Sequence, residues 1–118
     1  MPLRAVLVVE DEAAVALELD RLLQGLGYRV LGPAFTVQQG LKMIETEPPD
    51  AALLDVNVGG ELVTPVAEAL RERNVPFGLL TASVEIREPE LKSAPMVRKP
   101  IWDGDQIARL LESVLPPN

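Results

Sequence analysis

The sequence predicts an α/β fold built around a doubly wound sheet of five parallel strands. Short, continuous runs of apolar residues alternate along the chain with segments whose apolar residues recur at helical spacing. The connections are short, and polar or acidic residues directly follow several of the apolar runs. A chain of 118 residues with this pattern is long enough for one compact domain with an apolar core.

The first half of the chain predicts three strands and two helices. The strands are Ala5 to Val9, Tyr28 to Leu31 and Ala51 to Leu54, whose apolar runs are typical of strands buried on both faces. The first helix is predicted to begin near Glu12, and Thr36 is predicted to be the N-cap of the second. Apolar helical faces and helix ends are marked by Val15, Leu19, Leu22, Leu23, Leu26, Gly25 and Gly27, then by Val37, Leu41, Ile44, Pro48 and Pro49.

The second half continues the alternation after a loop at Gly59 and Gly60. Thr64 is expected to cap a helix whose first residue is Pro65. A short or broken helix is predicted within Val84 to Ala94, because Pro89 interrupts that segment. The remaining predictions are a helix with Val66, Ala69 and Leu70, strands at Phe77 to Leu80 and Met96 to Arg98, a capping box of Asp103 and Gln106, and a last helix with Ile107, Leu110, Leu111 and Val114.

Composition excludes several classes of function. The formal net charge is −7 and basic residues are scattered, so no basic surface for DNA or RNA is predicted. The absence of cysteine excludes disulfides and thiolate chemistry, and the absence of histidine excludes imidazole catalysis by this chain. The N-terminal apolar run is too short for a signal peptide or a membrane span, so a cytoplasmic protein without membrane contact is expected.

Polar residues end four of the predicted strands. Glu10, Asp11 and Glu12 follow the first strand, Asp55 the third, Thr81 the fourth, and Lys99 with Pro100 the fifth. In open α/β sheets, ligands bind beyond the carboxyl ends of the strands, so these side chains are expected at one edge. Two carboxylates about 4 Å apart repel by roughly 4 kcal/mol at an effective dielectric near 20. A hard cation such as Mg²⁺ would offset that repulsion, while Lys99 and the Thr81 hydroxyl could hold phosphoryl oxygens.

This order of motifs resembles the receiver domain of bacterial response regulators over nearly the whole chain. The resemblance rests on the acidic pair Glu10 and Asp11, then Asp55, Thr81, and the pair Lys99 and Pro100. It implies the flavodoxin-like receiver fold with strand order 2-1-3-4-5, and a single domain over residues 1–118 without an output domain. It also implies Mg²⁺ as cofactor, and a sensor histidine kinase or phosphotransfer protein as partner.

The resemblance further implies a role for each site residue. Asp55 would be the nucleophile that attacks phosphohistidine, and Thr81 and Lys99 would bind the phosphoryl oxygens. Mg²⁺ would be held by Asp11, Asp55 and the backbone carbonyl of Asn57, with Glu10 acting through water. Ala82 would leave room for the donor, and the Lys99–Pro100 bond would be cis. The chain would be a phosphoacceptor that assists its own phosphorylation and dephosphorylation rather than an enzyme.

A second resemblance concerns the segment from Leu54 to Ala82. Its sequences Asp-Val-Asn-Val-Gly-Gly-Glu and Asn-Val-Pro-Phe are similar to those of stand-alone receivers that accompany the HWE class of sensor histidine kinases. With the last helix ending near Pro116, this implies a protein that acts by touching partners or by draining phosphoryl groups from a kinase.

Three alternatives remain open at this stage. Receivers usually carry Tyr or Phe at the position of Met96, so a binding module that works without phosphorylation is one of them. A Mg²⁺-dependent aspartyl phosphatase would need a second Asp where this chain has Asn57, with its nucleophile after the first strand. A flavodoxin-like FMN carrier would place phosphate where Glu10, Asp11 and Glu12 would repel it.

Overall fold

The computed structural model describes residues 3–82, 86–101 and 104–117. The elements in chain order are β1 (Ala5–Val9), α1 (Ala13–Gly25), β2 (Arg29–Ala34), α2 (Val37–Thr46), β3 (Ala51–Asp55), β4 (Asn57–Val58), β5 (Glu61–Leu62), α3 (Thr64–Glu72), β6 (Phe77–Thr81), α4 (Pro89–Lys92), β7 (Met96–Arg98) and α5 (Gly104–Val114). Among the described residues, no helix combines the length and the apolar character that a membrane crossing requires.

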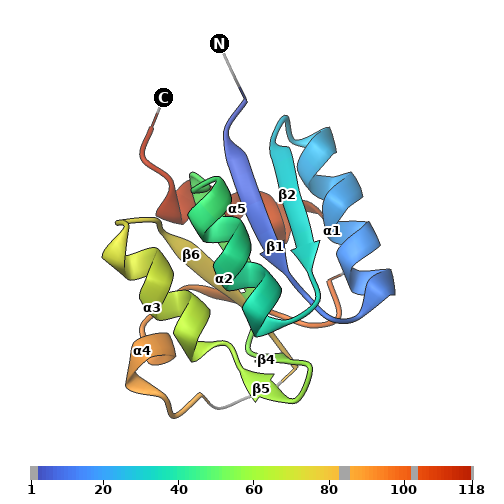
Figure 1. Cartoon of the computed structure of the whole chain (residues 1–118). Helices are drawn as coiled ribbons and strands as arrows, with labels where there is room; N and C mark the ends of the chain where they lie inside the picture. The colour runs from blue at the N-terminus through green and yellow to red at the C-terminus, as the bar shows by residue number, and fades with distance from the viewer. Residues whose placement is uncertain (1–2, 83–85, 102–103, 118) are drawn as a thin grey trace.

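Five of the strands form one sheet in the order β2-β1-β3-β6-β7, and every neighbouring pair is parallel. If the short β4–β5 hairpin is left out of the numbering, this is the predicted order 2-1-3-4-5. The prediction of a doubly wound, five-stranded parallel sheet is therefore confirmed. Figure 1 shows the helices on both sides of this sheet, with α2 and α3 in front and α5 behind.

Two apolar layers cover the two faces of the sheet, because successive residues of a strand point to opposite faces. Leu7 and Val9 of β1 belong to the layer formed with α2, α3 and α4. Val6 and Val8 belong to the layer formed with α1 and α5. All five residues of β1, β3 and β6 are buried, which explains why these strands are the continuous apolar runs of the sequence.

Strand β2 is longer than its predicted range of Tyr28 to Leu31. It begins at Arg29 and continues to Ala34, past the cis peptide bond between Gly32 and Pro33. The register against β1 shifts between Leu7 and Val9, where the chain passes this dipeptide. Proline is tolerated there because β2 is an edge strand, whose outward N–H groups need no partner in the sheet.

Other boundaries also differ from the predictions. The loop at Gly59 and Gly60 is the turn of the β4–β5 hairpin, which was not predicted. The cap assigned to Thr64 is wrong by one residue: Val63 is the N-cap of α3, and Thr64 is its first residue. The predicted short helix is the single turn α4, which begins at Pro89 because proline suits the first turn of a helix. Asp103 of the predicted capping box lies outside the described residues.

The N-cap predicted at Thr36 is confirmed, because the Thr36 hydroxyl accepts a hydrogen bond of 3.0 Å from the backbone N–H of Gln39. We expect Thr36→Ala to lower the free energy of unfolding by about 1 kcal/mol, since one N–H of the first turn of α2 loses its partner. Chemical denaturation followed by circular dichroism checks this value. Thr46→Ala is the matched control. The Thr46 hydroxyl only donates to the Lys42 carbonyl within the same helix, so a similar loss in both variants would contradict a specific role of the cap.

Candidate functional site

The site lies at the carboxyl edge of the sheet, where four strands end next to one another. Glu10 follows β1, Asp55 ends β3, Thr81 ends β6 and Lys99 follows β7. Backbone hydrogen bonds hold these ends together, since the N–H of Lys99 donates to the carbonyl of Thr81 at 2.8 Å. The N–H of Glu10 donates to the carbonyl of Ala34 at 2.9 Å, which ties the first acid to the end of β2.

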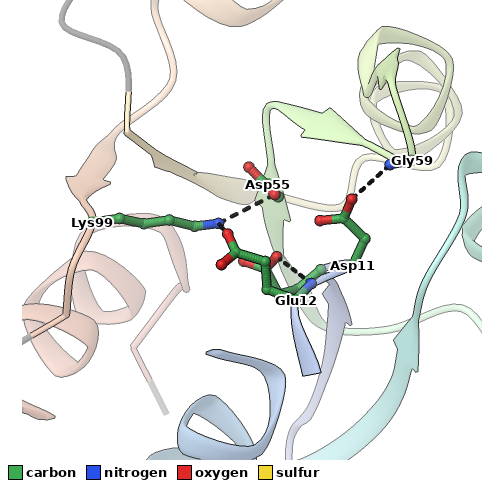
Figure 2. A network of polar contacts seen from close by, with 6 residues as sticks. Asp11, Glu12, Asp55, Gly59 and Lys99 are labelled. Atoms are coloured by element: carbon green, nitrogen blue, oxygen red, sulfur yellow. Dashed lines mark hydrogen bonds and ion pairs between the residues drawn. The ribbon is translucent and has the colours of Figure 1, made fainter. Parts of the chain in front are cut away.

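The Lys99 ammonium group is the centre of the polar network (Figure 2). Its Nζ lies 2.7 Å from Glu10 Oε1, 3.2 Å from Glu12 Oε1 and 3.2 Å from Asp55 Oδ2. Burial by itself lowers the pKa of Lys99, but the hydrogen bond and charge of Glu10, together with Asp55, outweigh it and raise that pKa above its ordinary value. Lys99 therefore stays charged and offsets the surrounding carboxylates.

Glu10 is the most deeply buried acid of the site, at 0% exposure against 8% for Asp55. One carboxylate oxygen faces Lys99, and the other accepts a hydrogen bond of 3.0 Å from the backbone N–H of Glu12. Burial raises the pKa of Glu10 to about 7, against the hydrogen bonds from Lys99 and Glu12, which lower it. Glu10 is a carboxylate whose charge depends on a nearby cation, because burial disfavours the ionised form.

Asp11 is exposed, and it lies on the side of the acid cluster away from Lys99 (Figure 2). Its Oδ2 accepts a hydrogen bond of 2.9 Å from the backbone N–H of Gly59, at the turn of the β4–β5 hairpin. This hydrogen bond holds the pKa of Asp11 below its ordinary value. Gly59 takes a φ of +59°, a conformation that favours glycine, so the turn can present its N–H to the acid.

A cavity of about 290 Å³ opens over these residues. Its lining consists of Asp11, Glu12, Asp55, Val56, Asn57, Thr81, Ala82 and Lys99. Glu10 is absent from the lining, although it contacts Lys99, whereas Asp55 lines the cavity. Thr81 is 2% exposed and Ala82 is exposed, so a buried hydroxyl residue and a small side chain form one wall. The Lys99–Pro100 peptide bond is cis, as the resemblance implies.

The donor set suits a hard divalent cation. Glu10, Asp11 and Asp55 each offer a carboxylate oxygen, and these oxygens all lie within 4.8 Å of one another. Carboxylate and carbonyl oxygens are the ligands that Mg²⁺ prefers, and Asn57 also lines this cavity. Every residue predicted for the metal site and for the phosphoryl site thus lies at this edge of the sheet.

Glu12 and Gly59 are contacts of the site that the sequence did not reveal. Glu12 belongs to the acids that follow the first strand, but its position in the sequence does not indicate that its side chain reaches Lys99, 87 residues away along the chain. The sequence indicates only a loop at Gly59. The one available signal was its place two residues after Asn57, close to a predicted strand end.

Met96 lies on β7 at the position where receivers usually carry an aromatic residue. Its side chain is 45% exposed, and it lines a groove with Arg98 and Arg109. The thioether is therefore on the surface of the molecule. Met96 does not line the cavity that holds Asp55.

Comparison with curated proteins gives regulatory proteins. No protein-family model matches the chain. The chain is 34% identical over 119 residues to a positive alginate biosynthesis regulatory protein of Pseudomonas aeruginosa. That alignment covers 96% of this chain and 48% of the relative. It is 32% identical over 83 residues to the phyllosphere-induced regulator PhyR of Methylorubrum extorquens, covering 68% of this chain and 31% of the relative. The chain thus spans less than half of the length of these relatives.

Solved structures similar to the chain include signal receiver domains. The solution structure of SdrG from Sphingomonas melonis is 38% identical, with a TM-score of 0.84 and coverage of 96% of this chain and 98% of that one. A signal receiver domain from Desulfovibrio desulfuricans is 27% identical, with a TM-score of 0.79 and coverage of 95% and 93%. A CheY-like receiver domain from Methylobacillus flagellatus, at 24% identity, a TM-score of 0.82 and coverage of 95% and 98%, supports the fold alone.

Proposed function

The chain belongs to the receiver-domain family of response regulators, and on this premise we propose that Asp55 accepts a phosphoryl group from a phosphohistidine of a sensor histidine kinase or a phosphotransfer protein. One observation carries the proposal. Of the three clustered acids, Asp55 is the one that both faces the cavity and contacts the Lys99 ammonium group, at 3.2 Å. A nucleophile in that position is open to a donor and lies beside a positive charge.

The proposed step moves a negatively charged phosphoryl group from an imidazole nitrogen to a carboxylate. A carboxylate oxygen of Asp55 forms a bond to phosphorus, the bond between phosphorus and the imidazole nitrogen of the donor breaks, and that nitrogen keeps the electron pair. In-line positioning and charge compensation are the main requirements of this chemistry. Lys99 supplies a positive charge, the Thr81 hydroxyl can donate to a phosphoryl oxygen, and Ala82 leaves space for the donor.

Asp11, Asp55 and the backbone carbonyl of Asn57 would hold Mg²⁺, and Glu10 would act through a water molecule. When bound, the cation neutralises charge on the carboxylates and on the transferring phosphoryl group. The hydrogen bond from Gly59 leaves the second oxygen of Asp11 available for this role. The buried carboxylate of Glu10 forms an ion pair with the Lys99 ammonium group at 2.7 Å.

The phosphorylated protein would signal through contacts with other proteins or serve as a sink for phosphoryl groups. The segment Asp55 to Glu61 covers β4 and the turn of the β4–β5 hairpin. Its similarity to stand-alone receivers that accompany HWE kinases supports a kinase of that class as the donor. The exposed Met96 supports a second candidate function, a receiver-like module that binds its partner without phosphorylation.

A small-molecule donor tests the proposed function directly. We expect acetyl phosphate with Mg²⁺ to add one phosphoryl group to the protein, seen as a single mass increase in intact-protein mass spectrometry. The adduct should be lost on treatment with hydroxylamine, as acyl phosphates are. If purified candidate kinases and acetyl phosphate all leave the mass unchanged, the phosphoacceptor function is refuted and the binding module becomes the better account.

Mg²⁺ is expected to stabilise the folded protein, because it binds the acid cluster of the folded state and not the unfolded chain. At a Mg²⁺ concentration ten times the Kd, the free energy of unfolding should rise by about 1.4 kcal/mol, which corresponds to roughly 5 °C in Tm. Thermal unfolding with Mg²⁺ and with a chelator measures the shift. Asp11→Asn should reduce it strongly, and Asp20→Asn on the exposed part of α1 should not. Equal Tm values in the two conditions would refute a cation site here.

A further inference from the structure

Three carboxylates share the ammonium group of Lys99: it donates hydrogen bonds to Glu12 and Asp55 and forms an ion pair with Glu10. An ammonium group has three N–H donors. In the structure, three carboxylate oxygens lie within 3.2 Å of Nζ, one each from Glu10, Glu12 and Asp55. A phosphoryl group on Asp55 needs a donor from Lys99 for one of its own oxygens. That oxygen must therefore compete with the carboxylates already in contact with Lys99.

The three carboxylates differ in what it costs them to lose Lys99. Glu10 is completely buried, so its release would leave a carboxylate without its cation inside the protein, which is strongly unfavourable. Asp55 is the acceptor itself and stays in place as the phosphoryl group is attached. The Glu12 side chain is 64% exposed, so water can replace Lys99 as its partner at little cost.

We infer that Glu12 is the carboxylate that the phosphoryl group displaces from Lys99, and that Glu12 thereby limits how readily Asp55 is phosphorylated. The inference rests on the proposed function of Asp55. Glu12 lines the same cavity as Asp55, so its negative charge also faces the incoming phosphoryl group. Both effects, competition for Lys99 and repulsion of an anion, act in the same direction. Glu12 is thus a positioning residue that acts through Lys99.

The local structure allows this role to be tested without disturbing the fold. Glu12 is the N-cap residue of α1, but its side chain makes no capping hydrogen bond. The backbone N–H of Glu12 donates a hydrogen bond to Glu10 Oε2, and any residue other than proline keeps this N–H. Glu12→Gln therefore removes the charge and leaves size and backbone contacts unchanged.

The test compares Glu12→Gln with the wild-type protein and with Glu45→Gln, an exposed acid near the end of α2 whose replacement changes the net charge equally. The first measurement is the Kd for beryllofluoride, an anionic mimic of the phosphoryl group, in saturating Mg²⁺, by titration calorimetry. The second is the initial rate of phosphorylation by acetyl phosphate. We expect Glu12→Gln to bind the mimic about two- to fivefold more tightly and to react faster by a similar factor, as for the loss of one exposed ion pair. Glu45→Gln should match the wild type.

The affinity for Mg²⁺ alone separates this role from that of a metal ligand. If Glu12 acts through Lys99, Glu12→Gln changes the Kd for Mg²⁺ by less than about twofold, whereas loss of a ligand weakens it by a factor of ten or more. If the wild type is labelled but Glu12→Gln gains neither affinity for beryllofluoride nor phosphorylation rate, the inference is overturned and the proposed function stays intact. The same holds if Glu12→Gln gains no more than Glu45→Gln. A wild-type protein that neither binds the mimic nor is labelled overturns both.

Discussion

Asp55→Asn is expected to abolish phosphorylation by acetyl phosphate and by any histidine kinase that serves as donor. The neutral amide is a far weaker nucleophile than the carboxylate, and it also removes one charged oxygen from the contacts of Lys99. The neighbouring acids are poor substitutes in this geometry. Glu10 is buried and lies outside the cavity lining, and one oxygen of Asp11 is engaged by the N–H of Gly59. Intact-mass measurement after incubation with the donor should show no adduct.

The control for this variant is Asp20→Asn, which makes the same change in charge on α1. Asp20 accepts a hydrogen bond from Gln24 and takes no part in the site, so this variant should be labelled like the wild type. Thermal unfolding should show that Asp55→Asn is folded, and relief of repulsion in the acid cluster favours a Tm at or above the wild-type value. A phosphoryl group that still appears on Asp55→Asn, mapped by tandem mass spectrometry to another acid, would contradict the assignment.

The general fold could be predicted because the strongest sequence signal is the continuous apolar run. Strands β1, β3 and β6 are buried on both faces, so their boundaries differ little from the predicted ranges. The candidate site could be located for a related reason. Parallel strands end at the same edge, so the polar residue after each apolar run must lie near the others. The positions of Glu10, Asp55, Thr81 and Lys99 required no knowledge of side-chain conformation.

Other features depend on contacts that the sequence pattern does not encode. Strand β2 continues through Gly32 and Pro33, a dipeptide that usually marks a turn, because an edge strand can accommodate proline. The hairpin at Gly59 is held partly by Asp11, which lies 48 residues earlier in the chain. The contact of Glu12 with Lys99 depends on the conformation of an exposed side chain. Local periodicity carries no information on any of these contacts.

Charge compensation explains how the acid cluster is compatible with a folded chain. Three carboxylates with oxygens within 4.8 Å of one another repel strongly. Lys99 contacts two of them, Glu10 and Asp55, and the hydrogen bond from Gly59 stabilises the charge of the third, Asp11. These contacts balance much of the charge, and a divalent cation would complete the balance. The same residues that keep the cluster folded are therefore those that a phosphoryl group would use.

Gly32→Ala is expected to lower the free energy of unfolding by about 2–3 kcal/mol, the largest loss of stability that we predict for a single methyl group in this chain. Gly32 has a φ of +96°, a conformation that residues with a Cβ rarely adopt. A Cβ at this position would lie 2.8 Å from the backbone nitrogen of Ala34 and 2.9 Å from the carbonyl oxygen of Val8. Both atoms belong to the paired strands β1 and β2, so neither can move without disturbing the sheet.

Gly25→Ala is the matched control, because Gly25 is the last residue of α1 and a Cβ there would meet no atom within 4 Å. In that helical conformation alanine should be neutral or should stabilise the protein by about 0.5 kcal/mol. Urea denaturation of both variants measures the difference. Gly32→Ala should also weaken the binding of beryllofluoride, because the Ala34 carbonyl beside it accepts the N–H of Glu10 and so fixes the first acid of the site. If Gly32→Ala is as stable as Gly25→Ala, Gly32 does not have the positive φ described here. The hydrogen bond between Glu10 and the Ala34 carbonyl would then not fix Glu10 in the way proposed.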